Sequence, residues 1–287
     1  MEPADLVTTR TPAPGIAWLT LNRPQARNAQ NLALLDALDD AFTAAARDET
    51  VRVIVLGAAG KDFSAGHDLR EGLFSLPPER FGQRGAMGGY SEPGRHGHYA
   101  REAEVYFNRV RRWRDITKPT IAAVQGNCIA AGLMLAWACD LIVAADDARF
   151  SDPVVAMGVA GVEWFAHPWE MGSRRAKELL MTGDPFTAED ARASGMVNHV
   201  MPRAGLDAFT LDLAQRIAAK PAFALRMIKE SVNSTLDIQG QRAALEMAFR
   251  IHQLCHAQNV EVHGHQGDPA GFAIKPRPVA DPEPDGA

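Results

Sequence analysis

The sequence predicts an α/β fold, and three observations support this prediction. The first half of the chain holds short, β-branched apolar runs of the kind that form buried strands. These runs lie at residues 16–21, 51–56, 120–124 and 141–145. Segments with helical spacing of apolar residues alternate with them, and from Arg174 onward the pattern is almost wholly helical. Strands that alternate with helices and then give way to a helical block indicate an α/β core with a helical addition.

Each element of the first half follows from its local chemistry. The run at 16–21 ends before Asn22-Arg23-Pro24, because a proline cannot donate a hydrogen bond to a strand ladder. Asn31 is suited to cap the helix that follows, in which apolar residues recur every three or four positions from Leu32 to Phe42. The later runs are short and nearly continuous, as expected of strands that are covered on both faces.

The second half is predicted to contain a helix with a capping box and three longer amphipathic helices. Thr187-Ala188-Glu189-Asp190 pairs a capping hydroxyl with an acidic side chain three residues later. The three amphipathic helices lie between Ala204 and His263. Their apolar faces need a surface to pack against, and we expect that surface to belong partly to another subunit.

These patterns suggest one domain with two regions. We interpret residues 1–203 as the core and residues 204–275 as a helical region of the same domain. Residues 276–287 are proline-rich and acidic, so we expect a disordered tail there. The segment 72–98 is rich in Gly, Pro, Arg and His, and we expect it to be mobile.

Composition excludes several classes of protein. The formal net charge of −5 provides no field that gathers nucleic acid. No run of about 18 apolar residues is present, which argues against a membrane span. The first residues lack the basic and then apolar order of a secretory signal. The cysteines are read as reduced core thiols, and we expect a cytoplasmic protein. They are Cys128, Cys139 and Cys255.

Two short turns share an unusual property. Ser64-Ala65-Gly66 and Ala130-Ala131-Gly132 each join the end of a strand to the start of a helix through very small residues. Amides in the first turn of a helix have no internal partner and lie at its positive end. Two such turns that converge on one oxygen would form an oxyanion hole. The alternative is that both turns need small residues only for close packing.

The surroundings of these turns form an ordered set of motifs. They are Leu21-Asn22-Arg23-Pro24 with Asn28-Ala29, Phe63-Ser64-Ala65-Gly66-His67-Asp68-Leu69, Lys118-Pro119-Thr120-Ile121-Ala122-Ala123-Val124-Gln125-Gly126, Cys139-Asp140-Leu141-Ile142-Val143-Ala144 and Leu180-Met181-Thr182-Gly183-Asp184. From about residue 15 to residue 235, the chain resembles the crotonase (enoyl-CoA hydratase/isomerase) superfamily. The resemblance implies a crotonase/ClpP-like spiral of ββα units with a helical C-terminal trimerisation region. It also implies an acyl-CoA thioester as substrate, no cofactor apart from the coenzyme A of that substrate, and a homotrimer or dimer of trimers.

The resemblance also assigns residues to the site. The backbone amides of Ala65 and Ala131 correspond to the two oxyanion donors. Residues expected to lie around coenzyme A are Arg23, Arg27, Ala29, Ala65, Gly66, His67, Asp68 and Leu69. For the two arginines, a solvated surface charge is the alternative to a phosphate contact. Asp68 has the alternative role of a helix cap.

The two glutamates of the hydratases are replaced in this chain. Position by position they correspond to Met134 and Val154, and neither side chain transfers protons. An intact oxyanion hole without this acid–base pair favours double-bond isomerisation or decarboxylation over hydration. A non-catalytic acyl-CoA carrier is the rival interpretation, since it needs only the binding half.

Two other ionisable residues are candidates for the lost chemistry. His67 matches a histidine of crotonase-type methylmalonyl-CoA decarboxylases and could move a proton near neutral pH; the tyrosine that accompanies it there has no counterpart at residues 159–162. Glu163 lies close to a catalytic aspartate of the dienoyl-CoA isomerases. Because its neighbours are apolar, we expect a raised pKa and the role of proton carrier. The alternatives are that His67 merely lines the channel and that Glu163 pairs with Arg174 or Arg175.

The remaining polar residues are expected to have lesser roles. Asp152 is interpreted as a turn or subunit-contact residue. His167 and Glu170 share one helical face, but no third ligand is evident, so no metal site is expected. The other histidines are interpreted as solvated or on the surface: His96, His98, His252, His256, His263 and His265.

Overall fold

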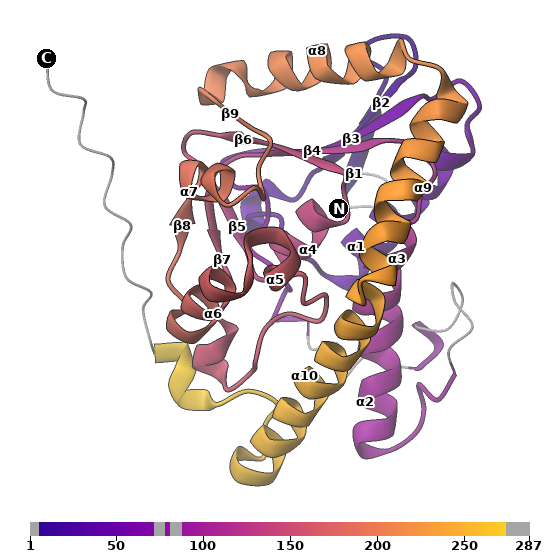
Figure 1. Ribbon diagram of the computed structural model, residues 1–287. Coiled ribbons are helices and arrows are strands. Elements are labelled where there is room, and N and C mark those ends of the chain that lie inside the picture. Colours follow the sequence, from indigo (N-terminus) through magenta and orange to yellow (C-terminus); the bar gives the residue numbers. More distant parts are fainter. Residues whose placement is uncertain (1–5, 72–77, 81–87, 274–287) are drawn as a thin grey trace, which may run out of the picture.

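The computed structural model describes residues 6–71, 78–80 and 88–273. A larger and a smaller sheet form its framework, with helices on both sides (Figure 1). The predicted α/β class is confirmed. Residues 276–287, and residues 72–77 and 81–87 of the segment expected to be mobile, lie outside the described part of the chain.

The larger sheet has six strands, which are neighbours in the same order as in the chain. They are β1 (Val7–Arg10), β2 (Ile16–Leu21), β3 (Val53–Ala58), β4 (Thr120–Val124), β6 (Leu141–Ala145) and β9 (His199–Met201). Only β1 and β2 pair antiparallel; the other neighbours are parallel. Each predicted run thus becomes a strand, although β3 begins two residues later than the apolar run at 51–56.

The smaller sheet contains the strand that leads into the second small-residue turn. Its strands are β5 (Asn127–Ile129), β7 (Arg149–Ser151) and β8 (Phe186–Thr187). These short strands lie between elements of the larger sheet and the helices. The chain repeatedly leaves the larger sheet, adds a short strand and returns through a helix.

Ten α-helices belong to the described residues. They are α1 (Leu32–Arg47), α2 (Gly94–Glu102), α3 (Asn108–Arg114), α4 (Ala131–Trp137), α5 (His167–Met171), α6 (Ser173–Thr182), α7 (Ala188–Ala193), α8 (Leu206–Ala218), α9 (Ala222–Ile238) and α10 (Gln241–His263). A π-helical turn, η5 (Ala103–Phe107), joins α2 to α3. The expected caps are present: the Asn31 side chain accepts from the Leu34 amide at 3.0 Å, and Thr187 and Asp190 form the capping box. None of the described helices is both long enough and apolar enough to cross a bilayer.

Two hydrophobic cores lie on opposite faces of the larger sheet. Alternate residues of β2 divide between them, because successive side chains of a strand point to opposite faces. Leu19 packs with α1 in one core, whereas Trp18 packs with Leu206 and Ala214 of α8 in the other. The helical region therefore contributes to both cores, through α8, which lies above the sheet in Figure 1, and through Leu245 and Phe249 of α10.

Part of the segment 72–98, for which mobility was expected, is helical. Residues 94–98 belong to α2, and His98 lies within 2.9 Å of the Gln266 side chain. Together α2, η5 and α3 form one continuous helical stretch beside α10 (Figure 1). The glycines of this segment do not prevent a helix. Gly97 is buried in α2, where the absence of a side chain allows the backbone to lie close to Glu92.

Candidate active site

The two small-residue turns lie against each other. The Ile129 amide donates to the carbonyl oxygen of Ser64 at 2.9 Å. A Cβ atom added at Gly66 would come within 2.9 Å of the Ile129 carbonyl oxygen and 3.4 Å of the Ala131 nitrogen. One added at Gly132 would come within 2.7 Å of the Ser64 carbonyl oxygen. Glycine at both positions therefore permits an approach that any side chain would prevent.

The structure corrects one of the two expected oxyanion donors. The amide of Ala65 donates to the Arg27 carbonyl oxygen at 2.9 Å, so the chain itself uses this hydrogen. The amides of His67 and Ala131 have no acceptor among the described residues. Ala131 is the first residue of α4, where helix amides lack an internal partner. The available donors are therefore the amides of His67 and Ala131.

His67 is held by an acidic side chain and an aromatic ring. Its Nε2 lies 3.1 Å from both carboxylate oxygens of Glu163. The Tyr106 ring stacks on the imidazole, with 3.7 Å between the ring centroids. Because an ionised carboxylate only accepts, Nε2 carries the donated hydrogen, and in the neutral ring Nδ1 has the lone pair. Nδ1 is buried and has no hydrogen-bond partner in the described structure.

The expected raised pKa of Glu163 is wrong. Burial alone raises this pKa, but His67 and His252 together lower it to about 2. His252 Nε2 lies 3.8 Å from a carboxylate oxygen of Glu163, in addition to the hydrogen bond from His67. The alternative partners Arg174 and Arg175 play no such part: Arg175 pairs with Glu178 and Asp190. Glu163 is thus an anion that orients an imidazole, and it accepts protons poorly near neutral pH.

A buried pair fixes the segment that carries Glu163. Asp152 lies 3.0 Å from Nε2 of His167, and both side chains are fully buried. The same carboxylate accepts from the Val162 amide at 3.0 Å. Asp152 lies at a turn, as expected, where it is the N-cap residue of η6 (Pro153–Met157), and its side chain is an internal anchor because it is fully buried within one chain. His167 of α5 thus has Asp152 as its partner.

Sequence reasoning missed a second layer of polar residues behind Glu163. Glu102, the last residue of α2, lies 3.4 Å from His252 Nε2 and 3.7 Å from His256 Nε2 of α10. The Gln253 side chain also donates to Glu102. His252, which was expected at the surface, is buried. His252 and His256 are four residues apart on one helix, and this spacing could have indicated a shared site. Nothing in the sequence places residues 102 and 106 next to them.

A family sequence pattern decides what the chain is related to. The pattern of the family "Enoyl-CoA hydratase/isomerase" matches residues 12–80 and 85–267. The chain belongs to the enoyl-CoA hydratase/isomerase family. The crotonase resemblance of the sequence is thereby confirmed.

Individual members of the family agree with this assignment. The "Putative enoyl-CoA hydratase EchA13" of Mycobacterium tuberculosis is 48% identical over 87% of this chain and 80% of its own length. The 1,2-epoxyphenylacetyl-CoA isomerase of Escherichia coli is 32% identical over 78% of this chain and 82% of its own. The crystal structure of a probable enoyl-CoA hydratase from Mycobacterium smegmatis has a TM-score of 0.83 at 48% identity, covering 91% of this chain and 98% of that chain. The expected crotonase fold is therefore confirmed.

The two positions expected to correspond to the hydratase glutamates are apolar and buried. Met134 of α4 and Val154 belong to the same hydrophobic core. Met134 retains 2% of its exposed surface and Val154 retains 9%. These positions contribute packing, and the ionisable groups of the site come from His67 and Glu163.

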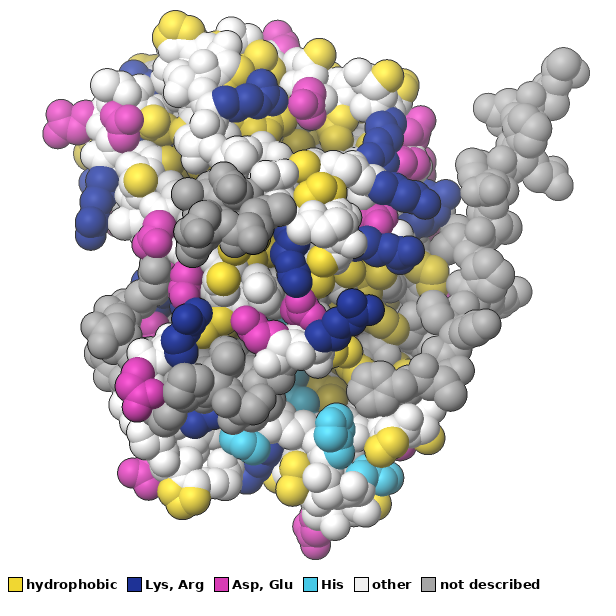
Figure 2. All heavy atoms as spheres, turned by 180° about the vertical axis from the view of Figure 1, so that it is seen from behind, with side chains coloured by type: hydrophobic (Ala, Val, Ile, Leu, Met, Phe, Trp, Pro, Cys, Tyr) yellow, Lys and Arg dark blue, Asp and Glu magenta, His cyan; other side chains and the backbone are white. Residues whose placement is uncertain are grey.

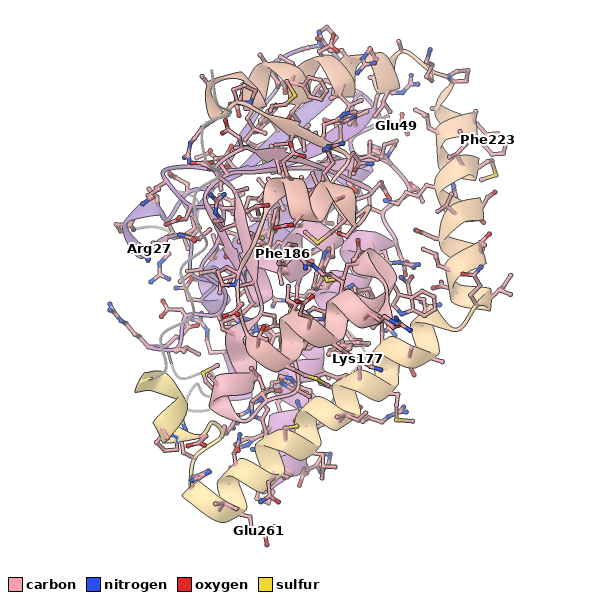
Figure 3. All side chains as sticks on the ribbon, turned by 60° about the vertical axis from the view of Figure 1, so that its left-hand side comes forward. Arg27, Glu49, Lys177, Phe186, Phe223 and Glu261 are labelled. Atoms are coloured by element: carbon pink, nitrogen blue, oxygen red, sulfur yellow. The ribbon has the colours of Figure 1, made fainter. Side chains whose placement is uncertain are left out.

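The residues expected around coenzyme A divide into engaged and exposed groups. Arg23 donates to the Ala29 carbonyl oxygen at 2.9 Å and pairs with Asp68 at 2.5 Å, which holds the pKa of Asp68 low despite partial burial. Arg27 is well exposed and stands at the edge of the molecule in Figure 3; its nearest acid is Asp62, at 3.7 Å. Leu69 is also exposed. Of the two arginines, Arg27 is the one with a side chain free to reach a phosphate.

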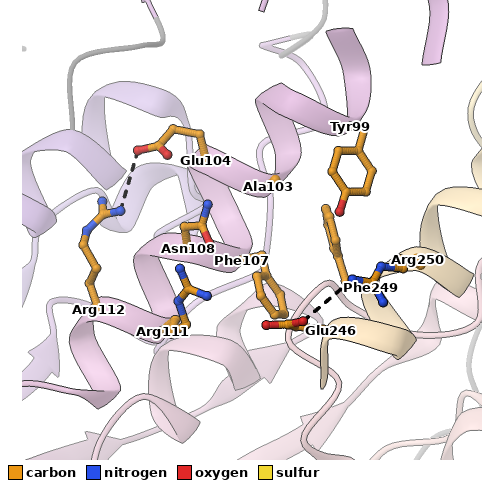
Figure 4. Close-up of a pocket in the computed structure, with 10 residues that line it drawn as sticks. All are labelled: Tyr99, Ala103, Glu104, Phe107, Asn108, Arg111, Arg112, Glu246, Phe249 and Arg250. Atoms are coloured by element: carbon orange, nitrogen blue, oxygen red, sulfur yellow. Dashed lines mark ion pairs between the residues drawn. The ribbon is translucent and has the colours of Figure 1, made fainter. Parts of the chain in front are cut away.

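Two surface hollows lie away from the paired groups. One, of about 350 Å³, lies between η5 and α10 and includes Tyr99, Phe107 and Phe249 (Figure 4). The other, of about 490 Å³, lies beside Arg203. Neither is lined by His67, Glu163 or Ala131. The site is therefore identified by its converging donors and its acid–base pair, not by the size of a hollow.

Proposed function

We propose that this protein isomerises the double bond of an enoyl-CoA by moving a proton between two carbons of the acyl chain. The observation that carries the proposal is His67, whose Nε2 is held by Glu163 and whose Nδ1 is unpaired. Membership of the enoyl-CoA hydratase/isomerase family supports an acyl-CoA substrate. The reaction needs no cofactor besides the coenzyme A of that substrate.

His67 acts as the base and then as the acid. Nδ1 takes a proton from Cα of a 3-enoyl chain, in which the double bond joins Cβ and Cγ, and the electron pair of the broken C–H bond moves through Cα–C to the thioester oxygen. The resulting dienolate takes the same proton back at Cγ, so the double bond moves and no atom is gained or lost. Glu163 stabilises the imidazolium between these steps, as a buried carboxylate does for a catalytic histidine.

The amides of His67 and Ala131 stabilise the enolate oxygen. Neither amide has an acceptor in the described part of the chain, and both belong to the adjoining turns. Preorganised donors of this kind typically contribute about 3 kcal/mol each, because they need no rearrangement when charge develops. One residue thus supplies the oxyanion donor through its backbone and the base through its side chain.

Replacing Gly66 tests this arrangement. We expect Gly66→Ala to slow enolate formation by about 10²-fold, the usual scale for one misplaced oxyanion donor. The added methyl group meets the Ile129 carbonyl oxygen at 2.9 Å and crowds the Ala131 amide. Gly195→Ala is a matched control, since Gly195 has a similar φ of 90° against 87° and nothing within 4 Å of an added Cβ. Equal losses in both variants would attribute the effect to backbone strain alone.

Hydration of crotonyl-CoA is expected to be at least about 10²-fold slower than in an ordinary hydratase. Met134 and Val154 provide neither the activation of water nor the delivery of a proton. The loss of the conjugated thioester absorbance measures this rate. A rate within a few-fold of an ordinary hydratase would mean that another group activates water, and isomerisation would no longer be favoured.

Decarboxylation is the second candidate, and Tyr106 is the observation that favours it. The related decarboxylases pair a histidine with a tyrosine, and Tyr106 stacks on His67 although it lies far from the aligned position. Release of CO₂ from methylmalonyl-CoA at a rate above that of double-bond migration would select this reaction.

We also propose that α9 and α10 form the contacts of a homotrimer or dimer of trimers. No residue of α9 is buried within one chain, and Figure 3 shows Phe223 projecting away from the core. Large apolar side chains on α9 are exposed at four positions: Phe223, Ile228, Val232 and Ile238. Such a face is typical of a subunit contact. Light scattering that gave a stable monomer at micromolar concentration would contradict this assembly.

A further inference from the structure

Three potential metal ligands from distant parts of the chain converge beneath the candidate active site. Glu102, His252 and His256 each direct one ligand atom to a common point, and these atoms lie within 4.8 Å of one another. Glu102 and His252 are buried, and His256 is partly exposed. Figure 2 shows histidine side chains grouped at one end of the molecular surface. Entry from solvent is thus possible on the His256 side.

The backbone fixes which nitrogen of each histidine faces the cluster. Nδ1 of His252 donates to the Gly161 carbonyl oxygen, and Nδ1 of His256 donates to the Gln266 carbonyl oxygen, both at 2.7 Å. A carbonyl oxygen only accepts, so both Nδ1 atoms carry hydrogen. In the neutral rings each Nε2 therefore presents a lone pair to Glu102. Metal-bound histidines are held in the same way, with the second nitrogen donating to a carbonyl or carboxylate.

The distances within the cluster suit a shared ion better than direct hydrogen bonds. His252 Nε2 lies 3.4 Å and His256 Nε2 lies 3.7 Å from the Glu102 oxygens. His252 Nε2 is buried without a hydrogen-bond partner among the described residues. Tetrahedral zinc, with bonds of about 2.0–2.1 Å, separates its ligand atoms by about 3.3–3.5 Å. The two imidazoles meet edge to face, with centroids 4.5 Å apart, which lets both nitrogens point to one centre.

We propose that Glu102, His252 and His256 form a binding site for one divalent transition-metal ion, with zinc as the best fit. Two imidazoles and one carboxylate are borderline ligands that suit zinc rather than magnesium or calcium, which prefer oxygen. The fourth position is left to water. None of the three ligands is a group that takes the substrate proton, although His252 Nε2 also lies 3.8 Å from Glu163, the residue that orients His67.

Charge balance agrees with such an ion. Glu102 and Glu163 are both buried, and each has a carboxylate oxygen near His252 Nε2. The distances are 3.4 Å for Glu102 and 3.8 Å for Glu163. Burying two carboxylates requires nearby positive charge. Without an ion, a proton on His252 supplies part of it. A divalent ion would take the place of that proton and offset both carboxylates.

Zinc binding to the full-length protein tests the proposal. We expect the metal-free protein to bind one Zn²⁺ per chain in equilibrium dialysis, and Co²⁺ to give the strong visible absorption of a tetrahedral site. His256→Ala should weaken binding by more than about 10²-fold, since even the loss of an outer partner costs about 10–100-fold. His263→Ala is the matched control on the same helix, because His263 is exposed to solvent and lies outside the cluster.

A second variant guards against loss of the fold. Glu102→Gln keeps the shape of the side chain, so circular dichroism should match the parent while Zn²⁺ binding falls like that of His256→Ala. Absence of stoichiometric binding in the parent would overturn the proposal and leave a proton on His252 as the only counter-charge. Equal binding by the parent and both cluster variants would also overturn it. Neither result bears on His67, whose role is tested by exchange at Cα.

Discussion

Replacement of His67 by alanine is expected to lower solvent deuterium exchange at Cα of a saturated acyl-CoA by about 10²–10⁴-fold, the usual contribution of a positioned acid–base group. The alanine variant keeps the backbone amide at this position, so the oxyanion donor stays in place. Only the imidazole and its Nδ1 lone pair are lost. Exchange at Cα reports enolate formation directly and does not require the natural acyl chain.

Glu163→Gln is expected to reduce the same exchange by at least about 10²-fold. A glutamine can donate to Nε2, which would move the ring hydrogen to Nδ1 and remove the base; a comparable tautomer change disables other catalytic histidines. Binding of the CoA thioester should change by no more than a few-fold in both variants, because neither side chain is required to hold the nucleotide.

The pattern of results separates the remaining interpretations. Undiminished exchange in His67→Ala, together with a large loss in Glu163→Gln, would assign the role of the base to Glu163 instead of His67. No exchange in the parent protein, together with tight thioester binding, would support the acyl-CoA carrier. A variant of Arg27, which is exposed and away from the acid–base pair, serves as the control for nucleotide binding.

Replacement of Asp152 by alanine is expected to lower the free energy of unfolding by about 1–3 kcal/mol, the usual cost of leaving a buried polar group without its partner. Asp152 and His167 are both fully buried, and the same carboxylate accepts from the Val162 amide. The substitution leaves two buried polar groups without their partner. Urea unfolding at fixed protein concentration measures the change.

An exposed ion pair provides the comparison for Asp152. Glu189 and Arg192 lie 2.7 Å apart on α7 with more than half of each side chain exposed, so Glu189→Ala should change the stability by less than about 1 kcal/mol. A loss of similar size in Asp152→Ala would mean that the surroundings relax around His167. The loop that carries Glu163 would then be anchored by apolar contacts, such as those of Val162 and Trp164, alone.

Local patterns predicted most of the fold. The apolar runs, the Asn31 cap and the Thr187 capping box depend on neighbouring residues, and the structure has each of them. The two small-residue turns were also recognised, but the identity of the free amide was not. The amide of Ala65 donates to the Arg27 carbonyl oxygen, whereas the amide of His67 does not. Residues 27 and 65 are far apart in the sequence, so no local pattern reveals this hydrogen bond.

The electrostatics of the site was less predictable. The apolar neighbours of Glu163 correctly indicated burial, but the pKa depends on charges that arrive from His67 and His252. Tyr106 reaches His67 from a π-helical turn, which has no clear sequence signal. Contacts between residues far apart in the chain therefore account for what the sequence could not show.

The position of α8 has a consequence for biosynthesis. Its apolar side covers the face of the larger sheet formed by Trp18 and Val53, and β9 completes that sheet only at residue 201. A ribosome releases the N-terminal part of a chain first. This face of the sheet therefore stays exposed until the last residue of α8, residue 218, has emerged. Partners so distant in sequence make closure slow. We expect the nascent chain to expose the apolar face of an incomplete, aggregation-prone sheet during this interval. It should depend on chaperones to avoid aggregation until α8 docks.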